Sequence, residues 1–291
     1  MTIPDDTKVT MLTSFGEYLL DPNWKYTESN DEYGIVLEKF PCITQAIRES
    51  PRKYRDILLE CGRQIGQGMA TFVGRELMTK EDMNEYCVSV SDVFCTGVAR
   101  LFVASGLETE LLVQDKPLVT HFSMIIQKVN SLRDFRKDWL CGRLYYTKDV
   151  WSKYVDNPGD FLKPENFHKG VKCVNELATD ALQHVLPALR FLARMKSPGA
   201  IKAFGIHTIM AVSTLECCYN NPRVFMESVK VERDVIVNIV KSSTSVASII
   251  DNVRRYIERI LERTCQATGA VQSTMDICRQ ILNHIELVKN D

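Results

Sequence analysis

Apolar residues recur at the three- and four-residue spacing of an α-helix along most of this chain, and the alternating runs that mark β-strands are scarce. The pattern is clearest after about Ser243, where Ile249, Val253, Ile257 and Ile260 fall on one face. We expect that face to pack against the protein core. The sequence therefore predicts an all-α fold of long packed helices.

Capping and turn residues predict where several helices begin and end. Thr79 followed three residues later by Asp82 resembles a capping box and predicts a helix through Ser105. Another helix is expected over about 51–73. No flexible linker or internal repeat divides the chain, so we expect one domain over 1–291. Further breaks are predicted at 157–159, 197–199 and 220–222, where Asn or Ser stands beside Pro.

Composition excludes several classes of function. Lys and Arg total 36 against 37 Asp and Glu, so the chain has no overall basic field with which to attract nucleic acid. The ten cysteines form no CxxC pair and no zinc-ligand spacing, so we expect reduced, mostly buried thiols. The amino terminus lacks the basic and apolar parts of a signal peptide, and no uncharged run looks long enough to span a bilayer. We therefore expect a cytoplasmic protein with no transmembrane segment.

One segment, 127–138, combines oxygen ligands with cations. On a continuous helix Gln127, Asn130, Asp134 and Asp138 would share one stripe. Two carboxylates one turn apart can share Mg²⁺, which completes its shell with phosphate oxygens, and a neighbouring Arg can neutralise the remaining charge. By spacing alone, a solvated helix face with weak ion pairs is the more common explanation, and both explanations stay open here.

These residues, with others along the chain, resemble the squalene synthase branch of the squalene/phytoene synthase family, and the similarity covers nearly the whole sequence. Besides segment 127–138, the matching motifs are Asp21-Pro22-Asn23-Trp24, Gly66-x-Gly68-Met69-Ala70, Tyr86-Cys87, Gly142-Arg143, Val150-Trp151, Lys163-Pro164-Glu165-Asn166 and Cys218-Tyr219-Asn220-Asn221.

The resemblance implies a single antiparallel helical bundle of the isoprenoid synthase type around a central pocket. In this family two farnesyl diphosphates bind through Mg²⁺ and condense, and NADPH reduces the product to squalene. It implies that Asp134 and Asp138 are catalytic metal ligands here. It further implies a monomer that uses farnesyl diphosphate or another isoprenyl diphosphate, with peripheral association at the endoplasmic reticulum. The implied substrate-binding residues are Gln127, Lys128, Asn130, Arg133 and Arg143.

The family's first Asp-rich motif and the helices before it do not occur in this sequence. Family members have a run ending in Glu-Asp-Asp-Met, and this chain begins at what resembles that Met. Either the opening helices were lost or the start of the sequence is placed too late. Asp5 and Asp6 follow the motif position, so we expect exposed turn residues and not replacement ligands.

Other departures lie inside the matched region. Ser89 stands where the family has a Tyr implicated in condensation, and a hydroxymethyl group offers no aromatic face to a carbocation. Lys137 replaces an acidic residue beside the metal ligands, which predicts weaker Mg²⁺ binding. Lys230 matches the NADPH-binding region, but Glu232 replaces an Arg there and should disfavour the cofactor. Asp92 replaces a glycine and either forms a new polar site or faces solvent.

Three hypotheses follow. The first is a diverged transferase of specialised terpenoid metabolism that ionises an isoprenyl diphosphate with Mg²⁺ but no longer performs reductive dimerisation. The second is a non-catalytic binding or assembly protein that keeps the helical scaffold, because a fold does not determine an activity. The third is a conventional squalene synthase with a truncated start.

Overall fold

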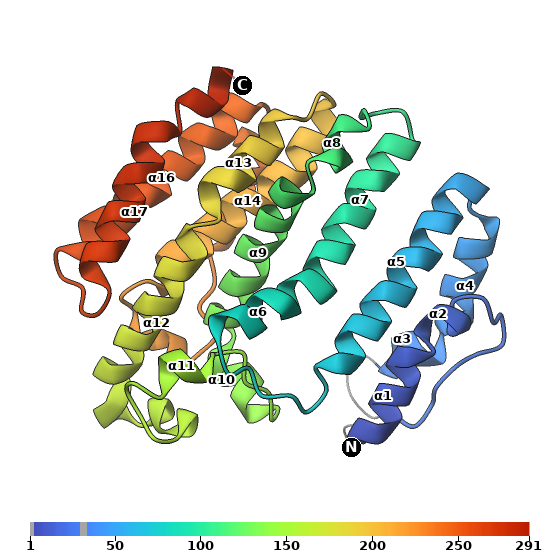
Figure 1. Ribbon diagram of the computed structural model, residues 1–291, viewed down its shortest axis with the longest axis horizontal. Coiled ribbons are helices and arrows are strands. Elements are labelled where there is room, and N and C mark those ends of the chain that lie inside the picture. Colours follow the sequence, from blue (N-terminus) through green and yellow to red (C-terminus); the bar gives the residue numbers. More distant parts are fainter. Residues whose placement is uncertain (1–2, 30–33, 291) are drawn as a thin grey trace.

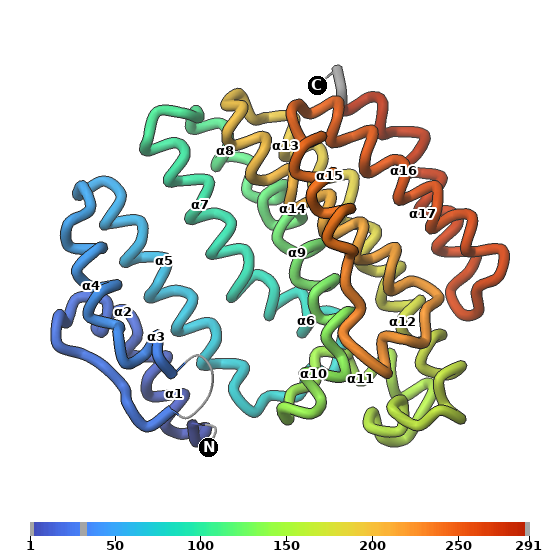
Figure 2. Tube along the Cα trace, turned by 180° about the vertical axis from the view of Figure 1, so that it is seen from behind, coloured from blue at the N-terminus to red at the C-terminus, as the bar shows by residue number. Residues whose placement is uncertain are grey.

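The computed structural model describes residues 3–29 and 34–290, and every regular element within those ranges is helical. Figure 1 shows the helices arranged side by side, with the amino-terminal group at one side and the carboxyl-terminal pair α16 and α17 at the other. Figure 2 shows the same order from behind. The predicted all-α fold is therefore confirmed.

The amino-terminal group packs on the long helix α5. A Cβ added at Gly66 would lie 2.4 Å from the carbonyl oxygen of Leu12, so only glycine allows α1 and α5 to approach this closely. A small apolar cluster of Leu19, Phe40 and Ile47 completes the contact. The helices of this group are α1 (Asp5–Thr13), α2 (Phe15–Tyr18), α3 (Gly34–Glu38), α4 (Phe40–Glu49) and α5 (Arg52–Thr71).

The next long helix contains a π turn. It begins as α6 (Lys80–Cys87), passes through the π segment η1 (Val88–Asp92) and continues as α7 (Val93–Ala104). Thr79 and Asp82 form the predicted capping box, and Gly106 follows the end of α7 with a φ of +80°. Segments of π-helix are rare and occur often at functional sites. The helix α8 (Leu111–Gln114) follows.

The helix α9 (Lys116–Arg133) lies at the centre of the main core and packs against α12, α13 and α14. The predicted apolar face of α16 is confirmed, because Ile249, Val253, Ile257 and Ile260 are fully buried. The remaining helices of this core are α12 (Phe167–Leu182), α13 (Val185–Ala193), α14 (Pro198–Cys218), α16 (Val246–Thr264) and α17 (Val271–His284).

Short helices close one end of the bundle near α10 and α11 (Figure 1). Phe135 packs there against the buried rings of Tyr146, Phe161 and Phe225, with ring centroids 4.6 to 5.9 Å apart. This aromatic cluster fixes the start of α10 on the core. The short elements at this end are α10 (Phe135–Leu140), α11 (Lys148–Trp151), η2 (Pro158–Leu162), η3 (Pro164–Asn166) and η4 (Pro222–Phe225). Two others, α15 (Arg233–Ser242) and η5 (Leu287–Asn290), lie nearer the other end of the bundle (Figure 2).

The structure corrects the prediction of one continuous helix through segment 127–138. The helix α9 ends at Arg133, and Asp134 has φ −97° and ψ 12°, outside the helical region, before α10 begins. The side chain of Asp134 is held by Arg133 and by Ser228, which arrives from the loop after η4. Asp138 therefore belongs to a second helix, but its backbone N–H still donates to the carbonyl oxygen of Asp134 at 2.9 Å, so the two aspartates remain one turn apart.

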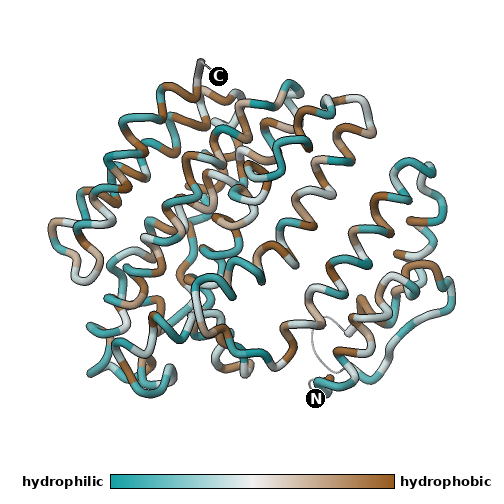
Figure 3. The backbone as a smooth tube through the Cα atoms, viewed as in Figure 1, coloured by the Kyte–Doolittle hydropathy of each residue, from teal (hydrophilic) through white to brown (hydrophobic). Residues whose placement is uncertain are grey.

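By length and composition alone, two helices could span a membrane, namely 80–104 and α14. Both contain charged residues, so this finding does not contradict the expectation that no uncharged run is long enough to span a bilayer. Most of the apolar stretch of α14 is buried, as in the core helix of a soluble protein, whereas the stretch within 80–104 is mostly unburied. Figure 3 shows the hydrophobic residues along α7, which forms the second half of that stretch. All ten cysteines are free thiols, and five are buried.

Candidate active site

Asp134 stands at the junction of α9 and α10 and is held from two sides. Nε and Nη2 of Arg133 contact its two carboxylate oxygens at 3.0 and 2.5 Å, and Oγ of Ser228 donates to Oδ1 at 3.2 Å. Burial opposes ionisation, but hydrogen bonding and charge from Arg133 outweigh it, so the pKa of Asp134 is lowered. Asp134 is therefore a carboxylate at neutral pH.

Asp138 lies one turn into α10 and is paired with Arg143. Both Nε and Nη2 of Arg143 donate to Oδ1, at 3.2 and 2.9 Å. Burial is the largest influence and raises the pKa of Asp138, although Arg143 acts in the opposite direction. The two carboxyl groups thus differ in environment. Each already holds a guanidinium that could instead bind the oxygens of an anionic ligand.

The π segment η1 reaches α9 beside these residues. Oγ of Ser91 donates to Oε1 of Gln127 at 2.7 Å, which orients the predicted substrate-binding amide. Asn130 lies one turn further along α9 and is half-buried. Ser89 lies against α5, since a Cβ added at Gly68 would be 2.3 Å from the Ser89 carbonyl oxygen. A catalytic role for Ser89 therefore stays a prediction, and its observed contact is helix packing.

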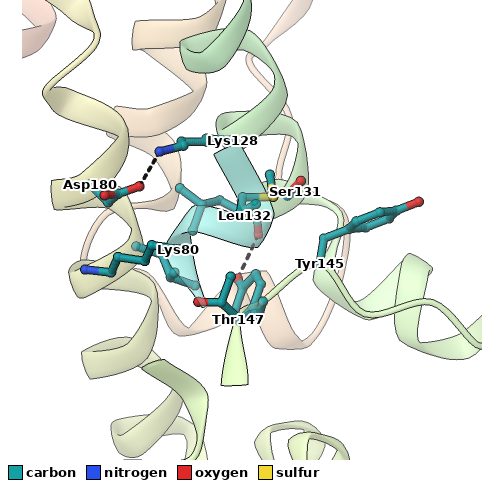
Figure 4. Close-up of a pocket in the computed structure, with 10 residues that line it drawn as sticks. Lys80, Lys128, Ser131, Leu132, Tyr145, Thr147 and Asp180 are labelled. Atoms are coloured by element: carbon teal, nitrogen blue, oxygen red, sulfur yellow. Dashed lines mark hydrogen bonds and ion pairs between the residues drawn. The ribbon is translucent and has the colours of Figure 1, made fainter. Parts of the chain in front are cut away.

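Lys128 is directed toward α12, away from the aspartate pair. Only 5% of Lys128 is exposed, and its Nζ lies 2.5 Å from Oδ2 of Asp180 and 3.0 Å from Nε2 of His184. Figure 4 shows the Lys128–Asp180 contact beside a cavity of about 20 Å³, also lined by Lys80 and Thr147. That volume suits one water molecule and not a prenyl chain. The predicted diphosphate contact of Lys128 would require this ammonium to leave two acceptors.

A second imidazole extends this buried network of hydrogen-bonded side chains. Nδ1 of His184 lies 2.7 Å from Nδ1 of His121. Because the Lys128 ammonium can only donate, His184 accepts at Nε2 and carries its proton on Nδ1, from which it donates to His121. Burial, followed by the charge of Lys128 and the presence of His121, lowers the pKa of His184 to about 3. His184 is therefore neutral at physiological pH.

The segment after η4 brings the predicted cofactor residue to the same region. Ser228 anchors this segment to Asp134, and Lys230 and Glu232 follow it with exposed side chains. Lys230 is therefore free to contact a ligand near the aspartates, and Glu232 places a negative charge two residues away. NADPH binding at Lys230 stays a prediction.

Asp92 resolves one open alternative, because it does not face solvent. It is 3% exposed at the end of η1, and its Oδ1 has no hydrogen-bond partner among the described residues. Burial raises the pKa of Asp92, while the hydroxyl groups of Thr120 and Ser123 and the charge of Lys116 partly oppose the shift. Asp92 therefore forms a buried polar site with α9.

The donor set fits Mg²⁺ only as a site shared with a diphosphate. The described residues contain no group of three His, Cys, Asp or Glu side chains that could hold a metal by themselves. Mg²⁺ is commonly bound by one or two carboxylates together with substrate phosphates and water. Asp134 and Asp138 supply carboxylates of that kind, and Lys137 is exposed beside them.

Several residues of this region were missed by sequence reasoning. Ser228, Asp180 and His184 meet α9 from positions 52 to 94 residues away along the chain. No local spacing signals such contacts. Tyr86 belongs to a family motif but was assigned no role, and Tyr145, two residues beyond Arg143, was not singled out.

Comparison with known proteins agrees with this architecture. The squalene/phytoene synthase family model matches residues 9–234. Squalene synthase of Rattus norvegicus is 33% identical over 99% of this chain and 70% of its own length, and that of Homo sapiens is 33% identical over 98% and 67%. A solved structure titled as the complex of TcSQS with the ligand E5700 has a TM-score of 0.94 at 27% identity, covering 99% of this chain and 85% of that one.

These findings also bear on the chemistry that the scaffold serves. The family and the fold together support a transferase that uses an isoprenyl diphosphate, in a family that generally requires Mg²⁺ and NADPH. One family assignment follows from the helical bundle, from the α9–α10 junction with its two Arg–Asp pairs, and from the near full-length similarity. This chain belongs to the squalene synthase branch of the squalene/phytoene synthase family.

Proposed function

We propose that this protein is a diverged isoprenyl-diphosphate transferase of specialised terpenoid metabolism, whose diphosphate group binds at the α9–α10 junction. The observation that carries the proposal is the pair of aspartates held by Arg133 and Arg143. Bound Mg²⁺ would neutralise the leaving group, with Asp134 and Asp138 as its protein ligands. The two guanidinium groups would turn from carboxylate to phosphate oxygens, and Gln127 would orient the ligand.

The local charges suit ionisation of an allylic diphosphate. Arg133 and Arg143 place two permanent cations within hydrogen-bond distance of the proposed metal ligands. Fixed charges aimed at a leaving group stabilise the negative charge that develops as the bond breaks. The substitution at Ser89 favours an outcome other than reductive dimerisation, because no aromatic ring is present at that position.

The decisive experiment measures diphosphate release from farnesyl diphosphate by the purified chain, with and without Mg²⁺, together with mass spectrometry of extracted products. Magnesium-dependent release with a product other than squalene supports the proposal. Adding NADPH should change product formation little, because Glu232 places a carboxylate in the predicted cofactor region. Squalene formed only with NADPH would instead support a conventional squalene synthase.

A second candidate is a non-catalytic binding or assembly protein. It is favoured by the two ion pairs of the site, because Arg133 and Arg143 already neutralise the carboxylates that would otherwise bind a metal. A folded, helical protein that binds farnesyl diphosphate without releasing diphosphate would support it. A monomer, and peripheral association with the endoplasmic reticulum, remain further proposals; sedimentation and vesicle flotation test them.

A further inference from the structure

The loop between α10 and α11 carries two tyrosines past the candidate site. Gly142 turns the chain with a φ of +73°, and the backbone N–H of Arg143 then donates to the carbonyl oxygen of Asp138 at 2.8 Å. The loop is therefore held on α10 by both the backbone and the side chain of Arg143. Tyr145 follows two residues later and is half-buried.

The two neighbouring tyrosines have different environments. Tyr146 is 1% exposed, and its hydroxyl group donates to the carbonyl oxygen of Leu132 at 3.0 Å, which is a structural contact. Tyr145 instead points away from the Lys128–Asp180 pair in Figure 4. Unlike the hydroxyl group of Tyr146, that of Tyr145 makes no hydrogen bond to the backbone of the described residues, so it can contact a ligand.

Tyr86 of α6 packs against Tyr145, with ring centroids 5.1 Å apart and an interplanar angle of 31°. Burial, then the charge and hydrogen bonding of Tyr145, raise the pKa of Tyr86 well above its ordinary value, and Asp138 adds to the shift. Each phenol carries one O–H donor and can also accept, so the Tyr145 hydroxyl group can donate to a ligand while its ring stays packed on Tyr86.

We propose that the Tyr145 hydroxyl group donates a hydrogen bond to a diphosphate oxygen at the Asp138–Arg143 pair, and that Tyr86 is the positioning residue that orients it. This inference rests on the proposed function. Tyr145 lies two residues beyond Arg143, close enough to influence the pKa of that guanidinium, and Tyr86, which packs on Tyr145, lies within electrostatic range of Asp138. The proton stays on Tyr145, and the bond strengthens as charge develops on the leaving group.

The test compares Tyr145→Phe with Tyr154→Phe. Tyr154 is the matched control, because its hydroxyl group donates to Glu176 at 3.1 Å and makes no described contact with α10. Loss of a hydrogen bond to a charged group predicts about 10- to 100-fold lower kcat for magnesium-dependent diphosphate release in Tyr145→Phe, with little change in KM. Tyr86→Phe should lower kcat by a smaller factor at unchanged KM, and the Tyr154 variant should match the wild type.

Binding of inorganic pyrophosphate with Mg²⁺, measured by calorimetry, distinguishes a failure of this inference from a failure of the proposed function. Pyrophosphate should bind Tyr145→Phe about 5- to 10-fold more weakly than the wild type, which also tests a protein that binds without turnover. If the wild type releases diphosphate or binds pyrophosphate and Tyr145→Phe does so equally well, the inference is wrong and the proposed function is unaffected. A wild type that neither releases diphosphate nor binds pyrophosphate refutes the proposed function, and the inference with it.

Discussion

The buried chain of Lys128, His184 and His121 makes stability depend on pH in a defined direction. The pKa of His184 falls from the ordinary 6.5 to about 3 in the folded protein. Below pH 6.5 His184 therefore binds a proton in the unfolded chain but stays neutral in the folded protein. Its contribution to the free energy of unfolding is present in full above that pH, and it decreases by about 1.4 kcal/mol for each pH unit below it. His121 shifts in the same direction and adds to the effect.

The substitution His184→Gln removes this proton uptake while keeping hydrogen bonds available to both neighbours. The Gln oxygen can accept from Lys128 and its amide can donate to His121. Over the 1.5 pH units between the ordinary pKa and about pH 5, the wild type should lose roughly 2 kcal/mol more unfolding free energy than the variant. Asp180, which also binds Lys128, is present in both proteins.

Urea denaturation at about pH 7.5 and pH 5 measures the effect directly. The control is His207→Gln, because His207 is exposed and its Nδ1 contacts a carbonyl oxygen of its own helix, that of Ala203, at 2.7 Å. That variant should retain the wild-type pH dependence. If wild type and His184→Gln lose the same unfolding free energy between the two pH values, His184 is not held neutral by burial and Lys128, and the reasoning fails.

Three further outcomes follow from the same structure. Asp134→Asn and Asp138→Asn should each weaken magnesium-dependent binding of farnesyl diphosphate about 10-fold in calorimetry without loss of helical circular dichroism, and unchanged affinity would contradict the metal assignment. Asp92→Asn should stabilise the protein at neutral pH, because the raised pKa makes wild-type stability fall as the carboxyl group ionises; a lower urea midpoint would refute this. Gly68→Ala should cost about 1–3 kcal/mol, since its Cβ would meet the backbone of η1, whereas Gly199→Ala should unfold at the wild-type midpoint.

Local sequence determined the helices and much of the fold. The capping box at Thr79, the helix end near Ser105 and the apolar face of α16 all formed as predicted, because each depends on residues within a few turns of one another. The family motifs likewise identified the squalene synthase branch, since they are read residue by residue. The two aspartates and their nearest arginines were found in the same way.

Tertiary structure decided which of those residues act together. Periodicity placed Asp134 inside a helix, but Arg133 and a serine 94 residues away hold its side chain where α9 ends. The family resemblance implies that Lys128 binds diphosphate, yet Asp180, 52 residues away, holds its ammonium group toward α12. A helical pattern specifies which face a residue occupies. It does not specify the helix that covers that face, because this depends on how distant segments pack and bury charge.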